Sequence, residues 1–342
     1  MRYVQIPGTD LQLARVSFGA IPIRSLSFDE SRRVILESCE YGINFFDTAR
    51  GYGDSEEKLG YALQDRRQEV VLATKTARRT LDEAREELET SLSNLETDYI
   101  DLYQLHNVSS DEDFEKIMAD GGALEALREA QDEGLVRYVG VTSHDTETSK
   151  RLIRSGEFVS IMIPLNFMED DFTSEVLPLA QKHNVAVINM KPFAGGMIEE
   201  ASLALRYVLG TEGITLTIPG MSSVEEVQEN VGFADSPQEL TEAELAELED
   251  FKDEIGSEFC RSCDYCHPCP NEVEISRVLR SMRGFRRLGQ SWLKDNLSMI
   301  RKNVQACEDC GVCLPRCPYN LDIPRLLQEQ LDELQEHVAQ ST

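Results

Sequence analysis

Eight of the nine cysteines lie beyond residue 259, in two closely spaced runs that each end in Cys-Pro. The first run has the spacing C-x2-C-x2-C-x2-C-P and consists of Cys260, Cys263, Cys266, Cys269 and Pro270. The second has the spacing C-x2-C-x2-C-x3-C-P and consists of Cys307, Cys310, Cys313, Cys317 and Pro318. In a cytosolic protein such bunched thiols bind metal more often than they form disulfides. The two runs therefore predict metal centres.

The second run has the spacing by which bacterial ferredoxins hold iron–sulfur clusters, and the first run is one residue shorter. Because each [4Fe–4S] cluster takes four thiolates, the eight cysteines predict two clusters. In two-cluster ferredoxins the fourth cysteine of each run ligates the other cluster. By that analogy one cluster takes Cys260, Cys263, Cys266 and Cys317, and the other takes Cys307, Cys310, Cys313 and Cys269. Zinc stays open as the alternative, because paired C-x2-C units also bind zinc and His267 lies between two of the cysteines.

Four residues of different chemistry stand at or just after the ends of apolar runs in the first third of the chain. They are Asp47, Tyr52, Lys75 and His106. Each alone has a simpler explanation, such as a solvated strand end or a turn cap, but together on one rim they suit proton delivery to a carbonyl. A free tyrosine, with a pKa of about 10, is a poor acid at neutral pH, and a nearby ammonium would lower that pKa. We expect Asp47 to hold Lys75 charged, His106 to orient the substrate oxygen, and Tyr52 to give the proton.

The elements that must position these residues alternate between short β-branched runs and amphipathic helices. The expected strands are residues 14–20, 43–49, 70–75, 100–106, 138–143, 160–166, 186–193 and 214–220. Strands that each precede a helix predict a closed (β/α)8 TIM barrel, with function at the carboxyl ends of its strands. Residues 2–16 read as a hairpin that could plug the barrel floor. A helix opening with a Thr-x-x-Glu capping box and ending at Gly256 closes this part. We expect domains at 1–255 (the barrel) and 256–342 (a small, helical, ferredoxin-like iron–sulfur domain).

The charge and hydropathy of the chain exclude some classes of partner. The formal net charge is −28, from 34 basic and 62 acidic residues, which argues against nucleic acid and anionic membranes. No apolar run is long enough to span a bilayer, and the N-terminus lacks a signal pattern, so we expect a cytoplasmic protein. One segment, Arg277–Lys302, is strongly basic. It is either a helix face that is salt-bridged to the acidic barrel or a local field that offsets an anionic cluster or docks an acidic redox partner.

The first part of the sequence resembles the aldo-keto reductase family. The likeness covers residues 2 to about 250 and rests on "GINFFDTARGYGDSEEKLGYAL", "VVLATK", "SLSNLETDYIDLYQLH" and "GLVRYVGVTSHD". It implies that Asp47, Tyr52, Lys75 and His106 are the family's catalytic tetrad. It also implies a barrel that binds an extended nicotinamide cofactor without a Rossmann motif, in agreement with the absence of G-x-G-x-x-G here. The whole chain resembles the subgroup with a C-terminal 4Fe–4S ferredoxin-type domain.

The resemblance also implies a nicotinamide coenzyme site, with departures from the family pattern. The expected residues are Thr142, Ser143, Asn166, Lys191, Ser222, Ser223, Glu226 and Asn230. The usual Ser-Asn after the fifth strand is Thr142-Ser143 here, and Met162 stands where the family has Gln. NADPH-dependent members place Lys and Arg at positions that hold Gly220 and Glu226 here. A carboxylate repels a 2′-phosphate but accepts from a ribose hydroxyl, so we expect NADH to be favoured over NADPH, or a weak site.

Three functions fit these patterns. In the first, NAD(P)H reduces an aldehyde or ketone in the barrel, and the clusters are structural or sense redox state. In the second, the clusters carry single electrons from a ferredoxin partner to a small-molecule carbonyl substrate at the barrel mouth. In the third, the protein is an electron-transfer or redox-sensing module with a vestigial barrel, although the intact tetrad argues against this. The substrate itself does not follow from the sequence.

Overall fold

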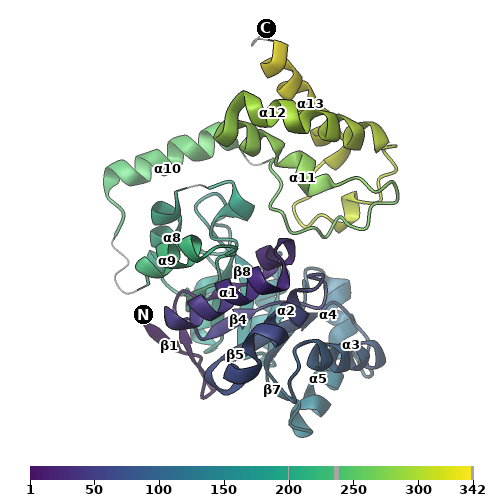
Figure 1. Cartoon of the computed structure of the whole chain (residues 1–342). Helices are drawn as coiled ribbons and strands as arrows, with labels where there is room; N and C mark the ends of the chain where they lie inside the picture. The colour runs from purple at the N-terminus through teal and green to yellow at the C-terminus, as the bar shows by residue number, and fades with distance from the viewer. Residues whose placement is uncertain (199, 235–238, 257, 340–342) are drawn as a thin grey trace. The chain divides into compact units, whose positions relative to one another are not determined.

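The computed structural model describes residues 1–198, 200–234, 239–256 and 258–339. The chain forms two compact units, one of Met1–Ala194 with Glu200–Leu248 and one of Gly195–Glu199 with Glu249–Thr342 (Figure 1). The boundary between the two units therefore lies inside the helix α10 (Glu242–Ile255). The boundary predicted from the sequence lies at the end of this helix. The domain limits 1–255 and 256–342 stay a prediction.

The first unit is a parallel eight-stranded barrel, as predicted. Its strands are β3 (Phe18–Gly19), β4 (Phe45–Asp47), β5 (Val71–Thr76), β6 (Ile100–Leu105), β7 (Val136–Thr142), β8 (Ser160–Pro164), β9 (Ala186–Met190) and β10 (Leu216–Thr217). Each pairs in parallel with the next in sequence. Parallel bridges from Val16 to Thr217 and from Gly19 to Gly220 join the first strand to the last. The barrel is thus closed, and every expected strand is present.

Helices cover the outside of this barrel (Figure 1). They are α1 (Phe28–Glu40), α2 (Ser55–Leu63), α3 (Leu81–Asn94), α4 (Asp111–Met118), α5 (Ala123–Asp132), α6 (Thr146–Ser155), α7 (Val176–Lys182), α8 (Ala201–Gly210) and α9 (Val224–Gly232). Short 3-10 helices lie at Ile21–Ser25, Gln64–Glu69, Ala194–Gly196 and Leu314–Arg316. The strands are buried on both faces, as their β-branched composition requires. Their outward side chains and the apolar helix faces form one large core.

The N-terminal hairpin closes the barrel floor. Strands β1 (Tyr3–Gln5) and β2 (Gln12–Ala14) are antiparallel, with Tyr3 opposite Ala14. Leu11 and Leu13 pack with side chains inside the barrel, such as Phe45, in a single buried cluster. The predicted floor plug is confirmed.

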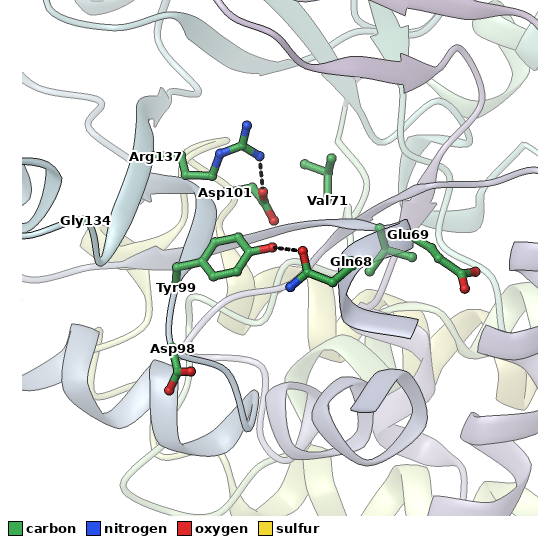
Figure 2. Close-up of a pocket in the computed structure, with 9 residues that line it drawn as sticks. Gln68, Glu69, Val71, Asp98, Tyr99, Asp101, Gly134 and Arg137 are labelled. Atoms are coloured by element: carbon green, nitrogen blue, oxygen red, sulfur yellow. Dashed lines mark hydrogen bonds and ion pairs between the residues drawn. The ribbon is translucent and has the colours of Figure 1, made fainter. Parts of the chain in front are cut away.

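A hollow of about 580 Å³ lies at the starts of β5, β6 and β7 (Figure 2). The buried Asp101 carboxylate organises it by accepting from Arg137 Nη1 at 2.6 Å and from Leu72 N at 3.0 Å. Arg67 Nη2 lies 2.8 Å from the same carboxylate. Because these groups lie at the amino ends of the strands and bond to one another, the hollow belongs to the stability of the floor.

The second unit is helical and has its own core. It contains part of α10, α11 (Ile275–Leu279), α12 (Ser281–Ala306) and α13 (Ile323–Ala339). Its buried core includes Val278, Leu293 and Leu334, and Cys266 belongs to the same cluster. The predicted Thr-x-x-Glu capping box opens α10, where Thr241 N donates to Glu244 Oε2 at 2.8 Å. No described helix of either unit is both long and apolar enough to cross a membrane.

Candidate active site and metal centres

Asp47 and Lys75 form a buried ion pair at the carboxyl ends of neighbouring strands. Asp47 closes β4, Lys75 lies near the end of β5, and Lys75 Nζ is 2.6 Å from Asp47 Oδ2. The same ammonium donates to Thr48 O at 2.6 Å, and Gln104 Nε2 donates to Asp47 Oδ1 at 3.0 Å. Parallel pairing of β4 with β5 sets this geometry. The ammonium is therefore fixed in position by two oxygen acceptors.

Burial shifts the titration of both partners. The pKa of the Asp47 carboxyl is raised by desolvation, against the opposing effect of Lys75. The pKa of the Lys75 ammonium is lowered by desolvation, and Asp47 opposes that shift. Loss of either partner would leave the other charge buried and unpaired.

Tyr52 lies beside this pair, in the loop between β4 and α2. Lys75 Nζ is 5.0 Å from the centroid of the Tyr52 ring. The Tyr52 and His106 rings meet edge-on, with centroids 5.8 Å apart and an interplanar angle of 82°. The four residues predicted to share one rim are thus brought together. Their catalytic roles stay predictions.

The surroundings of His106 favour its neutral form. Its pKa is held well below the usual histidine range, first by burial and then by the charges of Lys75, Arg79 and Lys191. Arg79 Nη2 also donates to His106 O at 2.9 Å, which fixes the strand end. A neutral imidazole that directly follows β6 suits a group that hydrogen-bonds an oxygen without competing for the proton.

The residues expected to hold the nicotinamide end of the coenzyme lie on the same rim. In the structure their side chains form hydrogen bonds with other residues of the protein. Thr142 Oγ1 accepts from Asn107 N at 2.7 Å. Asn166 Nδ2 donates to Lys191 O at 3.1 Å, and Ser143 Oγ donates to Asp145 O at 3.2 Å. The bonds of Thr142 and Asn166 hold neighbouring strand ends together, whereas that of Ser143 is local to the loop after β7. Contact with a coenzyme stays a prediction.

The residues expected at the adenosine end form the start of α9. Ser223 is the N-cap and accepts from Glu226 N at 3.2 Å. The Glu226 carboxylate accepts from Ser222 N at 2.7 Å and from Ser222 Oγ at 3.1 Å. Asn230 is buried on the same helix. Glu226 therefore serves its own helix while keeping a negative charge at this position.

Three residues of the rim were missed at the sequence level. Gln104 bonds Asp47, and it precedes His106 by two positions on β6, so strand alternation gave a signal for it. Arg79 and His144 were not singled out. The pKa of His144 is well below the usual range because of burial and the nearby charges of Lys191 and His106. A second imidazole two residues after the end of β7 is another polar group at a strand end, which the sequence could have indicated.

The eight clustered cysteines line two pockets in the second unit. One pocket is lined by Cys260, Cys263, Cys266 and Cys317, and we call it site I. The other is lined by Cys269, Cys307, Cys310 and Cys313, and we call it site II. The fourth cysteine of each run thus joins the other run, which is the division expected from the ferredoxin analogy. Ligation by these residues stays a prediction.

Both pockets combine cysteine thiols with apolar side chains. Apolar side chains such as Ile275 and Ile323 line both sites. Burial raises the pKa of Cys260 to about 11 and that of Cys266 to about 12, so binding of a metal centre must displace protons there. Four thiols around an apolar cavity fit a [4Fe–4S] cluster in each site.

A model of the aldo/keto reductase family matches residues 15–203. The chain belongs to the aldo/keto reductase family. It is an oxidoreductase of that type, and a 4Fe–4S dicluster domain matches residues 259–322. Two comparisons agree with the resemblance seen in the sequence, and the iron–sulfur prediction is confirmed at the level of the domain.

Several curated oxidoreductases and solved aldo-keto reductase structures are similar to this chain. The uncharacterized oxidoreductase YqkF of Bacillus subtilis is 28% identical over 73% of this chain and 96% of its own length. An NADH-specific methylglyoxal reductase of Escherichia coli is 28% identical over 58% of this chain and 69% of its own. The structure of AKR11C1 from Bacillus halodurans, in its holo form, superposes with a TM-score of 0.61 and 30% identity over 73% of this chain and 96% of that chain. A Klebsiella pneumoniae aldo-keto reductase solved with NADPH shares the fold, with a TM-score of 0.63 and 23% identity over 74% and 95% of the two chains.

Proposed function

We propose that the barrel reduces an aldehyde or ketone with a nicotinamide coenzyme and that Tyr52 gives the proton. The observation that carries this proposal is the Asp47–Lys75 ion pair beneath the Tyr52 ring, with Lys75 Nζ 5.0 Å from the ring centroid. A buried cation next to a phenol stabilises the phenolate that remains after proton transfer. Family membership supports the same reaction class.

Each residue of the site has a separate task in this proposal. When bound, the nicotinamide supplies the hydride to the carbonyl carbon. Tyr52 protonates the carbonyl oxygen, and neutral His106 orients that oxygen by a hydrogen bond. Lys75 stabilises the Tyr52 oxygen, and Asp47, itself held by Gln104, keeps Lys75 in place.

We further propose that NADH is preferred to NADPH. The reason is the Glu226 carboxylate at the start of α9, which would repel a 2′-phosphate. The relative from E. coli is named as NADH-specific, whereas the structure from K. pneumoniae was solved with NADPH, so both coenzymes occur among similar proteins. Calorimetric titration of the holoprotein tests the preference. NADH should bind more tightly than NADPH, and Glu226→Arg should narrow or reverse the difference.

For the metal centres we propose one [4Fe–4S] cluster at site I and one at site II. The support is the match to a dicluster domain together with four cysteines around each pocket. Protein purified without oxygen should hold about eight irons and about eight acid-labile sulfides per chain. A preparation with stoichiometric zinc and little iron would end this part of the proposal.

A second candidate function is reduction of the substrate by electrons from a ferredoxin. The exposure of Cys310 of site II favours it. An exposed cluster edge suits electron exchange with a ferredoxin, and the clusters would then deliver single electrons to the substrate while Tyr52 supplies protons. An anaerobic assay that offers NADH, NADPH or reduced ferredoxin to a panel of aldehydes and ketones separates the two. Turnover with a nicotinamide alone supports the first function. Turnover that requires ferredoxin and is lost in Cys310→Ala supports the second.

A further inference from the structure

Sites I and II differ in the charged side chains around them. Among the described residues that line the pockets, site I has Arg261 and Asp264, whereas the only charged one at site II is Glu308. Arg280 adds to site I because it directly follows Leu279, another lining residue. Arg325 follows Pro324 of site II in the same way, but it is exposed and paired with the carboxylates of Glu258 and Glu329. Site I thus has two arginines and one carboxylate beside it, whereas the arginine beside site II is offset by two carboxylates of its own.

Arg261 is held firmly in the protein beside site I. Only 8% of it is exposed, and its guanidinium carbon lies 3.8 Å from the Phe259 ring centroid and 4.4 Å from that of Tyr319. Arg261 Nη1 donates to Phe259 O at 2.6 Å. The backbone of Arg261 packs closely against Gly195, where an added Cβ would lie 2.4 Å from the Arg261 carbonyl. This positive charge is therefore part of the built structure.

Arg280 supplies the second positive charge. Its Nε is buried and has no hydrogen-bond acceptor among the described residues. Asp264 opposes the two arginines, although the Ser276 hydroxyl donates a hydrogen bond to its carboxylate. The net charge of these three side chains beside site I is therefore positive.

One-electron reduction makes a thiolate-bound cluster more negative. A positive charge fixed nearby in a low-dielectric interior stabilises the reduced state and raises the reduction potential. Burial alone has the opposite effect, and exposure of Cys310 to water favours reduction of site II. The buried Arg261 and the buried Nε of Arg280 lie in a poorly screened medium, whereas solvent screens the exposed Glu308 and Asp309 near site II. The arginines are therefore the groups that can reverse the order set by burial.

We propose that Arg261 and Arg280 raise the reduction potential of the site I cluster above that of the site II cluster. Site II, with its exposed cysteine, then receives an electron from an external one-electron donor, such as a reduced ferredoxin. That electron passes to site I, so that site II is reoxidised and site I is reduced, with no bond made or broken. The inference rests on the proposed ligand sets of the two sites.

A potentiometric titration of the anaerobic holoprotein, followed by electron paramagnetic resonance, tests this order. We expect two reduction steps. Arg261→Gln and Arg280→Gln should each move only the higher step to lower potential, with at least a tenfold fall in its reduction equilibrium constant, which is about 59 mV. Arg261→Lys, which keeps the charge, should restore most of the shift. Arg325→Gln is the matched control, because Arg325 carries the same charge in the same unit but pairs with Glu258 and Glu329.

The assignment of the steps uses Cys310→Ser, which changes one thiolate of site II and should perturb only the lower step. Iron content separates the possible failures. If each variant holds about eight irons but both steps move together, neither moves, or the lower step responds to the arginines, the inference is overturned. If the wild type itself lacks eight irons, the ligand proposal fails first. Should Arg261→Gln not fold, the Arg280→Gln variant decides the same question.

Discussion

Lys75 Nζ lies 2.6 Å from Asp47 Oδ2 and 5.0 Å from the centroid of the Tyr52 ring. The pair occupies the ends of two adjacent strands and is almost completely buried. A charge pair in this position costs desolvation free energy that a pair of apolar residues would not cost. The proposed proton transfer by the neighbouring Tyr52 phenol gives the pair a task other than stability.

Substitutions of Asp47 and Lys75 should therefore affect the stability and the turnover of the protein differently. Lys75→Met leaves the Asp47 carboxylate without its partner and should destabilise the barrel by about 3–5 kcal/mol, with loss of turnover. The double variant Asp47→Leu with Lys75→Met should recover most of this stability but no turnover. Urea unfolding and steady-state assays measure the two properties. A double variant that stays as unstable as Lys75→Met would mean that the cost is not the stranded charge.

Stability should fall as the pH drops below the ordinary histidine pKa of about 6.5. The pKa of His106 in the folded protein is depressed by burial and by Lys75, Arg79 and Lys191, and that of His144 by burial, Lys191 and His106. Below that pH the histidines of the unfolded chain bind protons that the folded imidazoles do not bind. Acidification therefore stabilises the unfolded state relative to the folded state. Each histidine contributes up to ~1.4 kcal/mol per pH unit.

The matched comparison is His106→Gln, which removes one of the two groups. Its free energy of unfolding, measured in urea between pH 5 and 7, should decline less steeply with acidification than that of the wild type. Equal slopes would show that His106 does not resist protonation in the folded state.

The floor hollow should matter for stability only. Asp101→Asn weakens the bonds to Arg67 and Arg137 and should cost about 2–4 kcal/mol without changing kcat of the folded enzyme. Asp98→Asn is the control, because Asp98 lines the same hollow but is exposed, and it should change stability by less than about 0.5 kcal/mol. A selective loss of turnover in Asp101→Asn would instead make the hollow part of the active machinery.

Gly195 should be intolerant of a side chain. It has a φ of +69°, and its added Cβ would lie 2.4 Å from the Arg261 backbone, so Gly195→Ala must shift the loop that carries Cys260 and Cys263. We expect a lower iron content and a lower melting temperature. Gly256→Ala tests the contribution of backbone conformation alone, since Gly256 has a φ of +67° with nothing within 4 Å of its added Cβ. Similar losses in both variants would mean that the close approach to Arg261 is unimportant.

The barrel and its rim were readable because local patterns determine them. Asp47, Lys75 and His106 end apolar runs, and parallel strands bring such ends together. The exchange of Cys269 and Cys317 between the runs followed from an analogy of spacing.

Residues that act through tertiary neighbours could not be read in this way. The guanidinium of Arg261 lies against the rings of Phe259 and Tyr319. No local sequence pattern indicates that Tyr319, which is distant in the sequence, packs on Arg261. Glu226 shows the converse case, since the pattern Ser223-x-x-Glu226 of a helix start was visible in the sequence. In the structure Ser223 Oγ accepts from Glu226 N, and the Glu226 carboxylate accepts from Ser222.

The central claim is most directly tested by nicotinamide-driven carbonyl reduction in Tyr52→Phe, with Tyr61→Phe as the control. Tyr61 is an exposed tyrosine whose hydroxyl donates to Asp29, away from the Asp47–Lys75 pair. With an anaerobic, iron-replete preparation we predict that kcat falls by about 10²–10⁴-fold in Tyr52→Phe and is unchanged in Tyr61→Phe. Wild-type turnover retained in Tyr52→Phe would contradict the account.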